Sequence, residues 1–326
     1  MDLVLPTFPL VVDLDQTLLK SDLLAEAGVQ YLKKNPLGIF SLLASLLGGK
    51  LAMKEKLATS FCPDISLLPY DDKVLSFVKK EKEKGRTIVL ATANHKAYAE
   101  QVAIHLSLFD KVFATSKGNN LSSKNKRDCL VREYGHKGFD YIANSSEDLP
   151  VWKAASRSWL VNPSAAVERQ ARKVGNVENV LHTKAPKNSS WIKALRLHQW
   201  VKNLLLFVPL FSAHLVDDMQ LVLTGLIAFL IFGLCASSVY LLNDIIDLED
   251  DRAHDSKGNR PFSSGELQIK HGLLASTVLF LLAFSLSWIL LPAIFTAALA
   301  VYYTVTLAYS FYLKQVMLVD VVTLAL

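Results

Sequence analysis

Two aspartates near the start of the chain, Asp13 and Asp15, stand two residues apart directly after an apolar run. A carboxylate at Asp13 can attack phosphorus and form an aspartyl-phosphate. A carboxylate at Asp15 can protonate the leaving oxygen and then activate water. Further along, Thr92 and Lys126 can bind phosphoryl oxygens, and Asp148 can join Asp13 in holding Mg²⁺ through hard oxygen ligands. These residue types in this order predict phosphoryl transfer with Asp13 as the nucleophile.

The same residues also occur in proteins without this chemistry. A pair such as Asp13 and Asp15 is found in solvated turns, and Lys126 can be an ordinary surface lysine. A domain that has lost its chemistry can also persist for packing or regulation. Measurable phosphatase activity would separate the catalytic alternative from these three.

A second acidic group lies in the run NDIIDLEDD at residues 243–251. Asp244, Asp247 and Asp251 are spaced i, i+3 and i+7, so on a helix they share one face. Three carboxylates on one face repel each other unless a cation lies among them. Mg²⁺ with a bound diphosphate meets this need with few protein ligands, because phosphates and waters complete its octahedron. The alternative is a solvated acidic helix end, and Glu249 and Asp250 are expected to face outward.

Basic side chains follow this acidic run at short range. They are Arg252, His254, Lys257 and Arg260. Cationic groups can bind a diphosphate and stabilise the charge that it gains as a leaving group. The acidic face and the basic stretch together predict a site for Mg²⁺ and a diphosphate donor.

The first half of the chain alternates apolar and charged segments. Apolar runs at residues 10–12, 87–91 and 139–143 each end at polar residues, with charged helical stretches between them. Strands that alternate with helices predict a parallel sheet, with the active site at the carboxyl ends of the strands. Residues 18–70 are expected to form a helical cap whose apolar stretch, 37–47, can touch the membrane.

The second half contains long segments without charge. Residues 219–242 are long enough to span the hydrocarbon core, and residues 272–313 predict two spans with a turn at Pro292. Residues 191–203 mix tryptophans with basic residues, which predicts an interfacial helix that continues into a first span at 204–216.

The positive-inside rule gives an orientation. The connection at residues 217–218 has no lysine or arginine, whereas residues 243–271 carry four. We therefore predict a multi-pass protein of the cell inner membrane, with the soluble domain and the 243–271 loop on the cytoplasmic side. The net charge of +5 gathers at the ends of the spans and does not predict nucleic-acid binding. The three cysteines show no ligand or disulfide spacing, and the N-terminal segment is not typical of a signal peptide.

Residues 7–162 resemble the haloacid dehalogenase (HAD) superfamily. The resemblance rests on Asp13-x-Asp15-x-Thr17, Thr92, Lys126 and the segment ANSSED that ends at Asp148. It implies an α/β Rossmann-like domain with a helical cap, and Mg²⁺ held among Asp13, Asp15, Asn144 and Asp148. Asn144 stands where the last motif usually has an acidic residue. Its carbonyl oxygen can still bind the metal, with one negative charge fewer.

Residues 190–326 resemble the UbiA superfamily of intramembrane prenyltransferases. The segments LRLHQWVKN, NDIIDLEDDRAH, KGNRPFSSG and AYSFYLKQVMLVDVV are similar to its decaprenyl-phosphate phosphoribosyltransferase branch, although Leu197 replaces a usual proline. In that branch a phosphoribosyl group passes from phosphoribosyl diphosphate to a lipid-linked phosphate. The residues that this implies for Mg²⁺ and the donor diphosphate are Asn243, Asp244, Asp247 and Asp251. Lys202, beside Gln199 and Asn203, would face anionic substrate.

These observations predict three segments. Residues 1–162 form the HAD-like domain, 163–190 a linker, and 191–326 an all-α UbiA-like membrane domain with four or five spans. The family has further spans and a second polar motif, so we expect either a fragment or a chain that cannot complete the transferase site alone. Asp320, in the last apolar run, is expected to face the interior of the helix bundle.

The leading hypothesis is therefore a bifunctional, Mg²⁺-dependent membrane enzyme. Its transferase half would use a polyprenyl phosphate and phosphoribosyl diphosphate, and its phosphatase half would remove a phosphate from the product. One alternative is prenyl transfer from a polyprenyl diphosphate to an aromatic or lipid acceptor, since both donors suit the same carboxylates. Another is a catalytically silent membrane anchor or assembly module. The sequence leaves the lipid length and the oligomeric state open.

Overall fold

The computed structural model describes residues 8–116, 118–183 and 187–311. The chain divides into two compact units, Met1–Ala185 and Pro186–Leu326. The predicted Asp320 and most of the segment AYSFYLKQVMLVDVV lie outside the described residues.

The first unit is built on a six-stranded parallel sheet. Its strands are β1 (Leu10–Val12), β2 (Ile88–His95), β3 (Lys111–Thr115), β4 (Asp140–Ala143), β5 (Ser158–Val161) and β6 (Val177–Leu181). They lie in the order β3-β2-β1-β4-β5-β6, which is the Rossmann strand order, with β1 at its centre. The predicted parallel sheet and Rossmann-like fold are confirmed.

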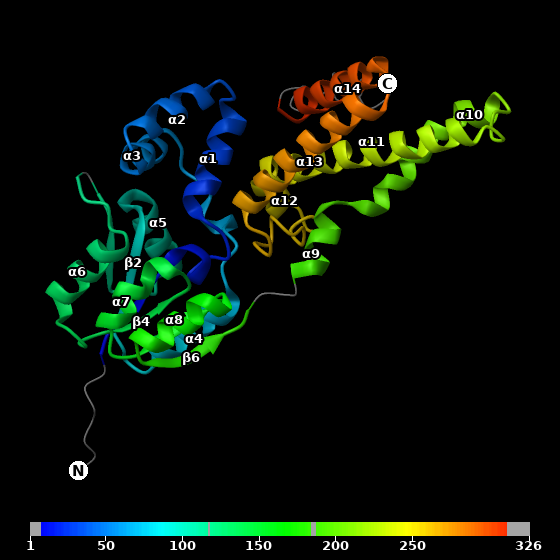
Figure 1. The fold of residues 1–326 in the computed structure, drawn as a ribbon. Helices are drawn as coiled ribbons and strands as arrows, with labels where there is room; N and C mark the ends of the chain where they lie inside the picture. Colours follow the sequence, from blue (N-terminus) through cyan, green and yellow to red (C-terminus); the bar gives the residue numbers. More distant parts are fainter. Residues whose placement is uncertain (1–7, 117, 184–186, 312–326) are drawn as a thin grey trace, which may run out of the picture. The chain divides into compact units, whose positions relative to one another are not determined.

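Helices cover both faces of this sheet (Figure 1). Leu10 and Val12 of β1 face a core built with α4 (Asp72–Glu83) and α5 (Lys96–Leu106). Because side chains alternate along a strand, Val11 points to the other face. That face packs against α6 (Ser123–Tyr134), α7 (Leu149–Ala154) and α8 (Ala165–Val174). The sheet is therefore buried on both sides, and its carboxyl edge is left for polar groups.

A helical insertion separates β1 from β2, as predicted. It consists of η1 (Leu14–Leu18), α1 (Leu23–Lys34), α2 (Gly38–Leu47), α3 (Lys50–Ser60) and η2 (Ile65–Leu67). Asp22 caps α1 by accepting a hydrogen bond from the Ala25 backbone N–H at 3.0 Å. Ala27 of α1 and Leu57 of α3 are fully buried against the core. The insertion thus forms a cap that packs on the first unit.

The prediction that residues 163–190 form a linker is wrong. Ser164 caps α8, and β6 pairs with β5 in the register Leu160↔Val180. β6 is an edge strand that leaves Glu178 and Asn179 exposed, so its polar residues concealed its strand character. β3, the strand at the opposite edge of the sheet, also carries an exposed polar residue, Lys111.

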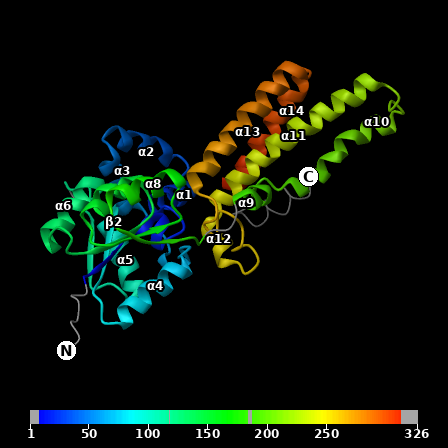
Figure 2. The same ribbon diagram turned by 60° about the horizontal axis from the view of Figure 1, so that its bottom comes forward.

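The second unit is entirely helical. Its elements are α9 (Lys187–Ala194), η4 (Leu197–Phe207), α10 (Val208–Ser212), α11 (Met219–Ile246), α12 (Leu248–Ala253), α13 (Ile269–Leu290) and α14 (Ala293–Phe311). Within the described part of the chain, three helices are long and apolar enough to cross a membrane, namely α11, α13 and α14. They pack beside one another (Figure 2). The predicted span at 219–242 and the two spans on either side of Pro292 are confirmed.

Small polar residues join two of these helices. Ser238 of α11 donates to the Ser276 backbone oxygen of α13 at 2.9 Å, and the Ser276 hydroxyl donates to the Ser238 oxygen at 2.9 Å. Such reciprocal bonds between small residues let two helices approach closely in an apolar environment.

The continuous interfacial helix at 191–203 and the regular first span at 204–216 are wrong. Arg196 adopts a left-handed backbone conformation (φ 51°) that ends the helical path of α9, and the chain continues as the 3₁₀ helix η4. Pro209 then lies in the first turn of α10, which is only five residues long. Proline lacks a backbone N–H and cannot continue a helix that precedes it, so η4 and α10 remain separate.

Candidate functional site

The carboxyl edge of the sheet positions Asp13. This residue directly follows β1, and its backbone N–H donates to the Ile142 oxygen of β4 at 3.0 Å. The chain then turns sharply through η1, where Gln16 has a positive φ of 54°. Asp13 is only 7% exposed. The fold therefore holds a carboxylate, almost out of water, at the centre of the edge where open α/β sheets carry their sites.

Lys126 of α6 joins Asp13 to a second carboxylate. Its Nζ lies 2.7 Å from Asp13 Oδ1, 3.0 Å from the Tyr141 hydroxyl and 3.5 Å from Asp148 Oδ1. The Tyr141 hydroxyl donates to Asp148 Oδ1 at 2.8 Å. The structure therefore brings three of the predicted residues into one buried network. Tyr141 was missed, because it lies within an apolar strand and only the three-dimensional structure turns its hydroxyl toward this network.

Burial and charge act against each other in this network. Burial raises the pKa of Asp13 to about 6, and Asp148 adds to the effect while Lys126 opposes it. Burial would lower the pKa of Lys126, but Asp13 and Asp148 together raise it above its ordinary value. The ammonium group thus stays charged beside the two carboxylates, where it can also attract a phosphoryl group.

Asp15 lies in a different environment from Asp13. Its Oδ1 accepts from the Leu23 backbone N–H at 3.0 Å, and its Oδ2 accepts from Asn94 Nδ2 at 2.7 Å. Burial, followed by the charge of Asp22, raises the pKa of Asp15 to about 8. A carboxyl group that keeps its proton near neutral pH can donate it to a leaving oxygen. This arrangement fits the acid role predicted for Asp15.

Thr92 and Asn94 lie at the end of β2. The buried Thr92 hydroxyl oxygen accepts from the Asn94 backbone N–H at 3.1 Å and from its Nδ2 at 3.3 Å. Thr92 thus orients the amide that holds Asp15. Asn94 was missed because the predicted strand ended at Thr92, whereas β2 continues to His95.

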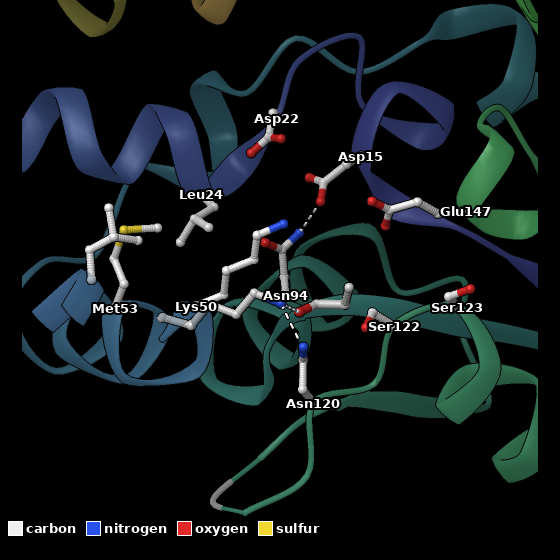
Figure 3. A pocket seen from close by; sticks show the side chains of 13 residues that line it. Asp15, Asp22, Leu24, Lys50, Met53, Asn94, Asn120, Ser122, Ser123 and Glu147 are labelled. Carbon is white, nitrogen blue, oxygen red and sulfur yellow. Dashed lines mark hydrogen bonds between the residues drawn. The ribbon is translucent and has the colours of Figure 1, made fainter. Parts of the chain in front are cut away.

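A pocket of about 570 Å³ opens beside Asp15 (Figure 3). Asp22, Asn94, Asn120 and Glu147 form polar parts of its lining, and the cap contributes Leu24, Leu46, Lys50, Met53 and Lys54. Lys54 Nζ donates to the Ala93 oxygen at 2.6 Å and to Asn120 Oδ1 at 2.9 Å, so it ties α3 to the carboxyl edge of the sheet. Burial lowers the pKa of Lys54. Asp13, Thr92 and Lys126 are not lining residues of this pocket, so Asp15 is the predicted catalytic group that reaches it.

The remaining predicted ligands follow β4. Asn144 Oδ1 accepts from the Thr17 hydroxyl at 3.5 Å, while Asp148 Oδ2 accepts from Ser145 N at 3.1 Å and Ser145 Oγ at 2.9 Å. The carboxylates of Asp13 and Asp148 and the amide of Asn144 are hard oxygen donors, the type that Mg²⁺ prefers. Among the described residues, no three His, Cys, Asp or Glu side chains are grouped to hold a metal. The donor chemistry fits Mg²⁺ through two carboxylates and one amide.

Replacing Lys126 by Met should leave Asp13 and Asp148 as uncompensated carboxylates in a buried site. Removing one partner of a buried ion pair typically costs about 3–5 kcal/mol. Thermal unfolding of the first unit in the detergent-solubilised chain should therefore shift clearly downward. Lys124→Met, an exposed lysine of the same helix, is the matched control and should change little. Equal stability of the two variants would contradict a buried charge network.

A second buried polar cluster lies in the helical unit. Asp244 near the end of α11 and Asp251 of α12 are both almost fully buried. Arg260 joins them, with Nη1 at 3.2 Å from Asp244 Oδ1 and 2.7 Å from Asp251 Oδ2. Arg196 also pairs with Asp244. The structure thus places the predicted first and last aspartates of the acidic face together, around a guanidinium group.

Asp247 lies between these two aspartates, where α11 ends and α12 begins. Its backbone N–H donates to Asn243 O at 2.9 Å, and Asp251 N donates to Asp247 O at 2.8 Å. These two hydrogen bonds meet at Asp247, whose non-helical backbone (φ −93°, ψ 15°) separates α11 from α12. Burial raises the pKa of Asp251, with Arg260 opposing and Asp247 adding to the rise.

Two arginines, Arg196 and Arg260, act on this acidic face. Arg196 was missed as a site residue because it lies 48 residues before Asp244 in the sequence. Its guanidinium also lies 5.2 Å from the centre of the Tyr240 ring. Guanidinium groups can bind diphosphate oxygens, and carboxylates can hold Mg²⁺, so the cluster has both halves of a diphosphate site.

The remaining predicted residues of this unit have varied environments. Arg252 Nε donates to the Ser263 oxygen at 2.8 Å, which fixes the loop after α12. The Asn243 amide oxygen accepts from Ser310 of α14. Asn203 is buried, and its Nδ2 has no hydrogen-bond partner among the residues that the structure describes. The structure leaves three predicted substrate-binding residues exposed, outside the buried cluster: Lys202, His254 and Lys257.

Residues 205–326 match the profile of the UbiA prenyltransferase family, so the C-terminal part of the chain is a UbiA-family domain. Together with the three long apolar helices of the described residues, this makes the chain a membrane protein.

Two curated relatives extend this comparison. The chain is 37% identical over 314 residues to the uncharacterized protein y4nM of Sinorhizobium fredii, covering 96% of this chain and 60% of that protein. It is 39% identical over 142 residues to a decaprenyl-phosphate phosphoribosyltransferase of Mycolicibacterium smegmatis, covering 42% of this chain and 44% of that enzyme. The chain therefore spans about half the length of these relatives.

Among solved structures, the chain is similar to a HAD-family hydrolase from Salmonella enterica serovar Typhi. The two share 14% sequence identity with a TM-score of 0.39, and the match covers 54% of this chain and 69% of the hydrolase.

Proposed function

We propose that the first unit is a phosphatase that uses Asp13 as its nucleophile and Asp15 as its acid. The observation that carries this proposal is the buried contact of Asp13 with Lys126, beside a carboxyl group whose pKa is raised to about 8. Lys126 holds the attacking carboxylate of Asp13 in place. Its positive charge also offsets the charge of the phosphoryl group that Asp13 receives. Asp15 gives its proton to the leaving oxygen and then takes one from water.

The second unit, in this proposal, transfers phosphoribosyl from phosphoribosyl diphosphate to a polyprenyl phosphate. The similarity to decaprenyl-phosphate phosphoribosyltransferase supports this donor and acceptor. Arg196 and Arg260 bind the diphosphate and stabilise the charge that develops as it leaves. Asn243, Asp244, Asp247 and Asp251 would hold Mg²⁺ and the donor diphosphate.

The two reactions form a chemical sequence. Phosphoribosyl transfer leaves a sugar that still carries its own phosphate, and this phosphate monoester is a substrate for an aspartate-nucleophile phosphatase. Because both units belong to one chain, the phosphatase is exposed to a high local concentration of the lipid product.

Mg²⁺ is the cofactor that suits both donor sets. Asp13, Asn144 and Asp148 would hold it in the first unit, and the acidic face would hold it in the second. When bound, it would neutralise phosphate charge, and so favour attack at phosphorus in the first unit and departure of diphosphate from the ribose carbon in the second.

Prenyl transfer is the second candidate for the helical unit, because the matching family is described as prenyltransferases. A polyprenyl diphosphate would use the same carboxylates and arginines. The two candidates differ in which labelled donor transfers its label to lipid.

Asn144→Asp tests the proposed metal site and the phosphatase together. A charged oxygen in place of an amide adds about 1 kcal/mol per unit charge even in a water-like environment, so the Mg²⁺ concentration for half-maximal activity should fall at least about fivefold. The measurement is the release of inorganic phosphate from a small monoester during an Mg²⁺ titration, with a chelator as the blank. An unchanged titration would remove Asn144 from the metal site, and activity that survives the chelator would refute metal dependence.

The proposed location is the cell inner membrane, with the first unit and the loop after α12 on the cytoplasmic side. Asp217 and Lys257 are both exposed and lie beyond opposite ends of α11. In a Cys62→Ser background, Asp217→Cys should react with an impermeant maleimide in intact cells, and Lys257→Cys only after permeabilisation. The reverse pattern would invert the topology.

A further inference from the structure

The cap of the first unit presents an apolar surface on α2. Its five most exposed apolar side chains are Leu37 (74%), Phe40 (70%), Leu43 (53%), Leu46 (48%) and Leu47 (93%). We call these five residues the α2 face. Large apolar side chains gathered in this way on one short helix mark a surface that contacts something other than water.

Packing fixes the direction in which the α2 face points. Leu42 is the large side chain of α2 that enters the core. Gly38 lies against the Tyr31 ring of α1 so closely that a Cβ atom there would be 2.6 Å from Tyr31 Cε1. α2 is therefore held to α1 along one side, and the α2 face remains on the other.

The length of α2 limits how it can meet a membrane. It has ten residues, about half the number that a helix needs to cross the hydrocarbon core. A short apolar helix of this kind can lie in the plane of the interface, with its apolar face buried in the headgroup and acyl boundary.

The charges around α2 are complementary to an anionic lipid surface. Residues 27–54 contain four lysines and no acidic residue. Lys34 before α2 and Lys50 after it are both exposed. Lysines that flank an apolar helix bind anionic headgroups while the helix inserts. The spans of the second unit already bring this chain to a bilayer.

The α2 face also borders the pocket beside Asp15. Leu46 belongs to the face and lines the pocket, and Lys50 and Met53 of α3 line the same pocket. A ligand that extends from the apolar surface to Asp15 therefore finds apolar side chains, ammonium groups and the acid in one pocket.

We propose that the α2 face inserts into the headgroup layer of an anionic bilayer, and that the pocket beside Asp15 takes a phosphate monoester carried by a lipid. This substrate class rests on the proposed phosphatase activity of the first unit. Lys50 and Lys54 then attract the phosphate, and the lipid chain stays among the apolar side chains of the cap and the bilayer.

Insertion is tested with a fluorescent label in the full chain, reconstituted in vesicles with anionic lipid. In a Cys62→Ser, Cys129→Ser background, an NBD label at Leu43→Cys should shift to the blue and be quenched by brominated lipids. Ile104 is the matched control, because it is an apolar residue that is 75% exposed on α5. A label at Ile104→Cys should stay water-like. Water-like fluorescence of the label at position 43 would overturn insertion. So would a blue shift of that label that persists in lipid-free detergent and grows with protein concentration, because it would indicate contact between protein molecules.

The substrate class is tested by kinetics of the full chain on two substrates. Leu43→Asp with Leu47→Asp should lower kcat/KM at least about tenfold for a vesicle-borne lipid phosphate monoester. The same variant should leave kcat/KM for soluble p-nitrophenyl phosphate unchanged, as should Ile104→Asp for both substrates. Equal loss on both substrates, or no loss on the lipid, would overturn the inference. If the unmodified protein hydrolyses neither substrate, the phosphatase proposal fails, and the label alone decides insertion.

Discussion

Asp13→Asn is expected to abolish the release of phosphate from a small monoester, by at least roughly 10³-fold, because an amide cannot form the aspartyl-phosphate. The loss should be catalytic. Burial raises the pKa of Asp13, so the folded protein already disfavours its charge, and Lys126 keeps Asp148 as its ionic partner when Asp13 becomes neutral. The melting temperature of the first unit should therefore be unchanged or higher.

Asp128→Asn is the control for this variant, since Asp128 is exposed and pairs on the surface with Arg127. It should keep full activity and stability. If Asp13→Asn retains a large fraction of activity, the nucleophile is another residue. If it loses activity only in step with loss of folding, the role of Asp13 is structural.

The second large effect is expected at Asp251, whose carboxylate lies 2.7 Å from Arg260 Nη1. Asp251→Asn removes a proposed metal ligand and leaves Arg260 paired with Asp244 alone. Loss of one electrostatic stabiliser of the transition state typically lowers the rate by about 10²- to 10³-fold, and a similar loss of transfer is expected here. The measurement is the incorporation of label from the diphosphate donor into lipid by membranes that contain the whole protein.

Asp250 provides a matched control for Asp251. It is the preceding aspartate on the same helix, and it is exposed. Asp250→Asn should therefore keep at least half of the transfer activity. Equal loss of transfer activity in the two variants would mean that only the overall negative charge of the helix end matters. The carboxylate face would then not be a binding site. Membrane content and detergent melting curves of both variants separate loss of chemistry from loss of folding.

The centre of the sheet and its polar edge could be predicted from the sequence. β1 and β4 are apolar segments that end at Asp13 and Asn144, and strands buried on both faces show their character locally. The spacing of Asp244 and Asp251 likewise identified a shared face, because helical periodicity is a local property.

Features that depend on tertiary contacts could not be predicted. The edge strand β6 has a polar, half-exposed pattern, and only its pairing with β5 shows that it is a strand. Arg196 belongs to the acidic cluster through a backbone turn with positive φ, which its sequence neighbours do not indicate. Tyr141 and Asn94 are ordinary strand residues until the fold places their polar atoms beside Asp148 and Asp15.

The exposure of the apolar stretch of the cap could be predicted only in part. Residues 37–47 are visibly apolar in the sequence, yet an apolar run of this length also fits a buried core helix. The structure distinguishes the two, because six large side chains of this segment are exposed and Leu42 enters the core.

One double-label experiment tests the proposed transfer and dephosphorylation most directly. Membranes with the whole protein receive polyprenyl phosphate, Mg²⁺ and phosphoribosyl diphosphate labelled with ¹⁴C in the ribose and ³²P at its 5-phosphate. We expect ¹⁴C to enter the lipid fraction while ³²P appears as inorganic phosphate, and we expect Asp13→Asn to keep both labels in the lipid. Release of ³²P from the lipid at an unchanged rate in Asp13→Asn would contradict the account, as would label that enters lipid only from a prenyl diphosphate.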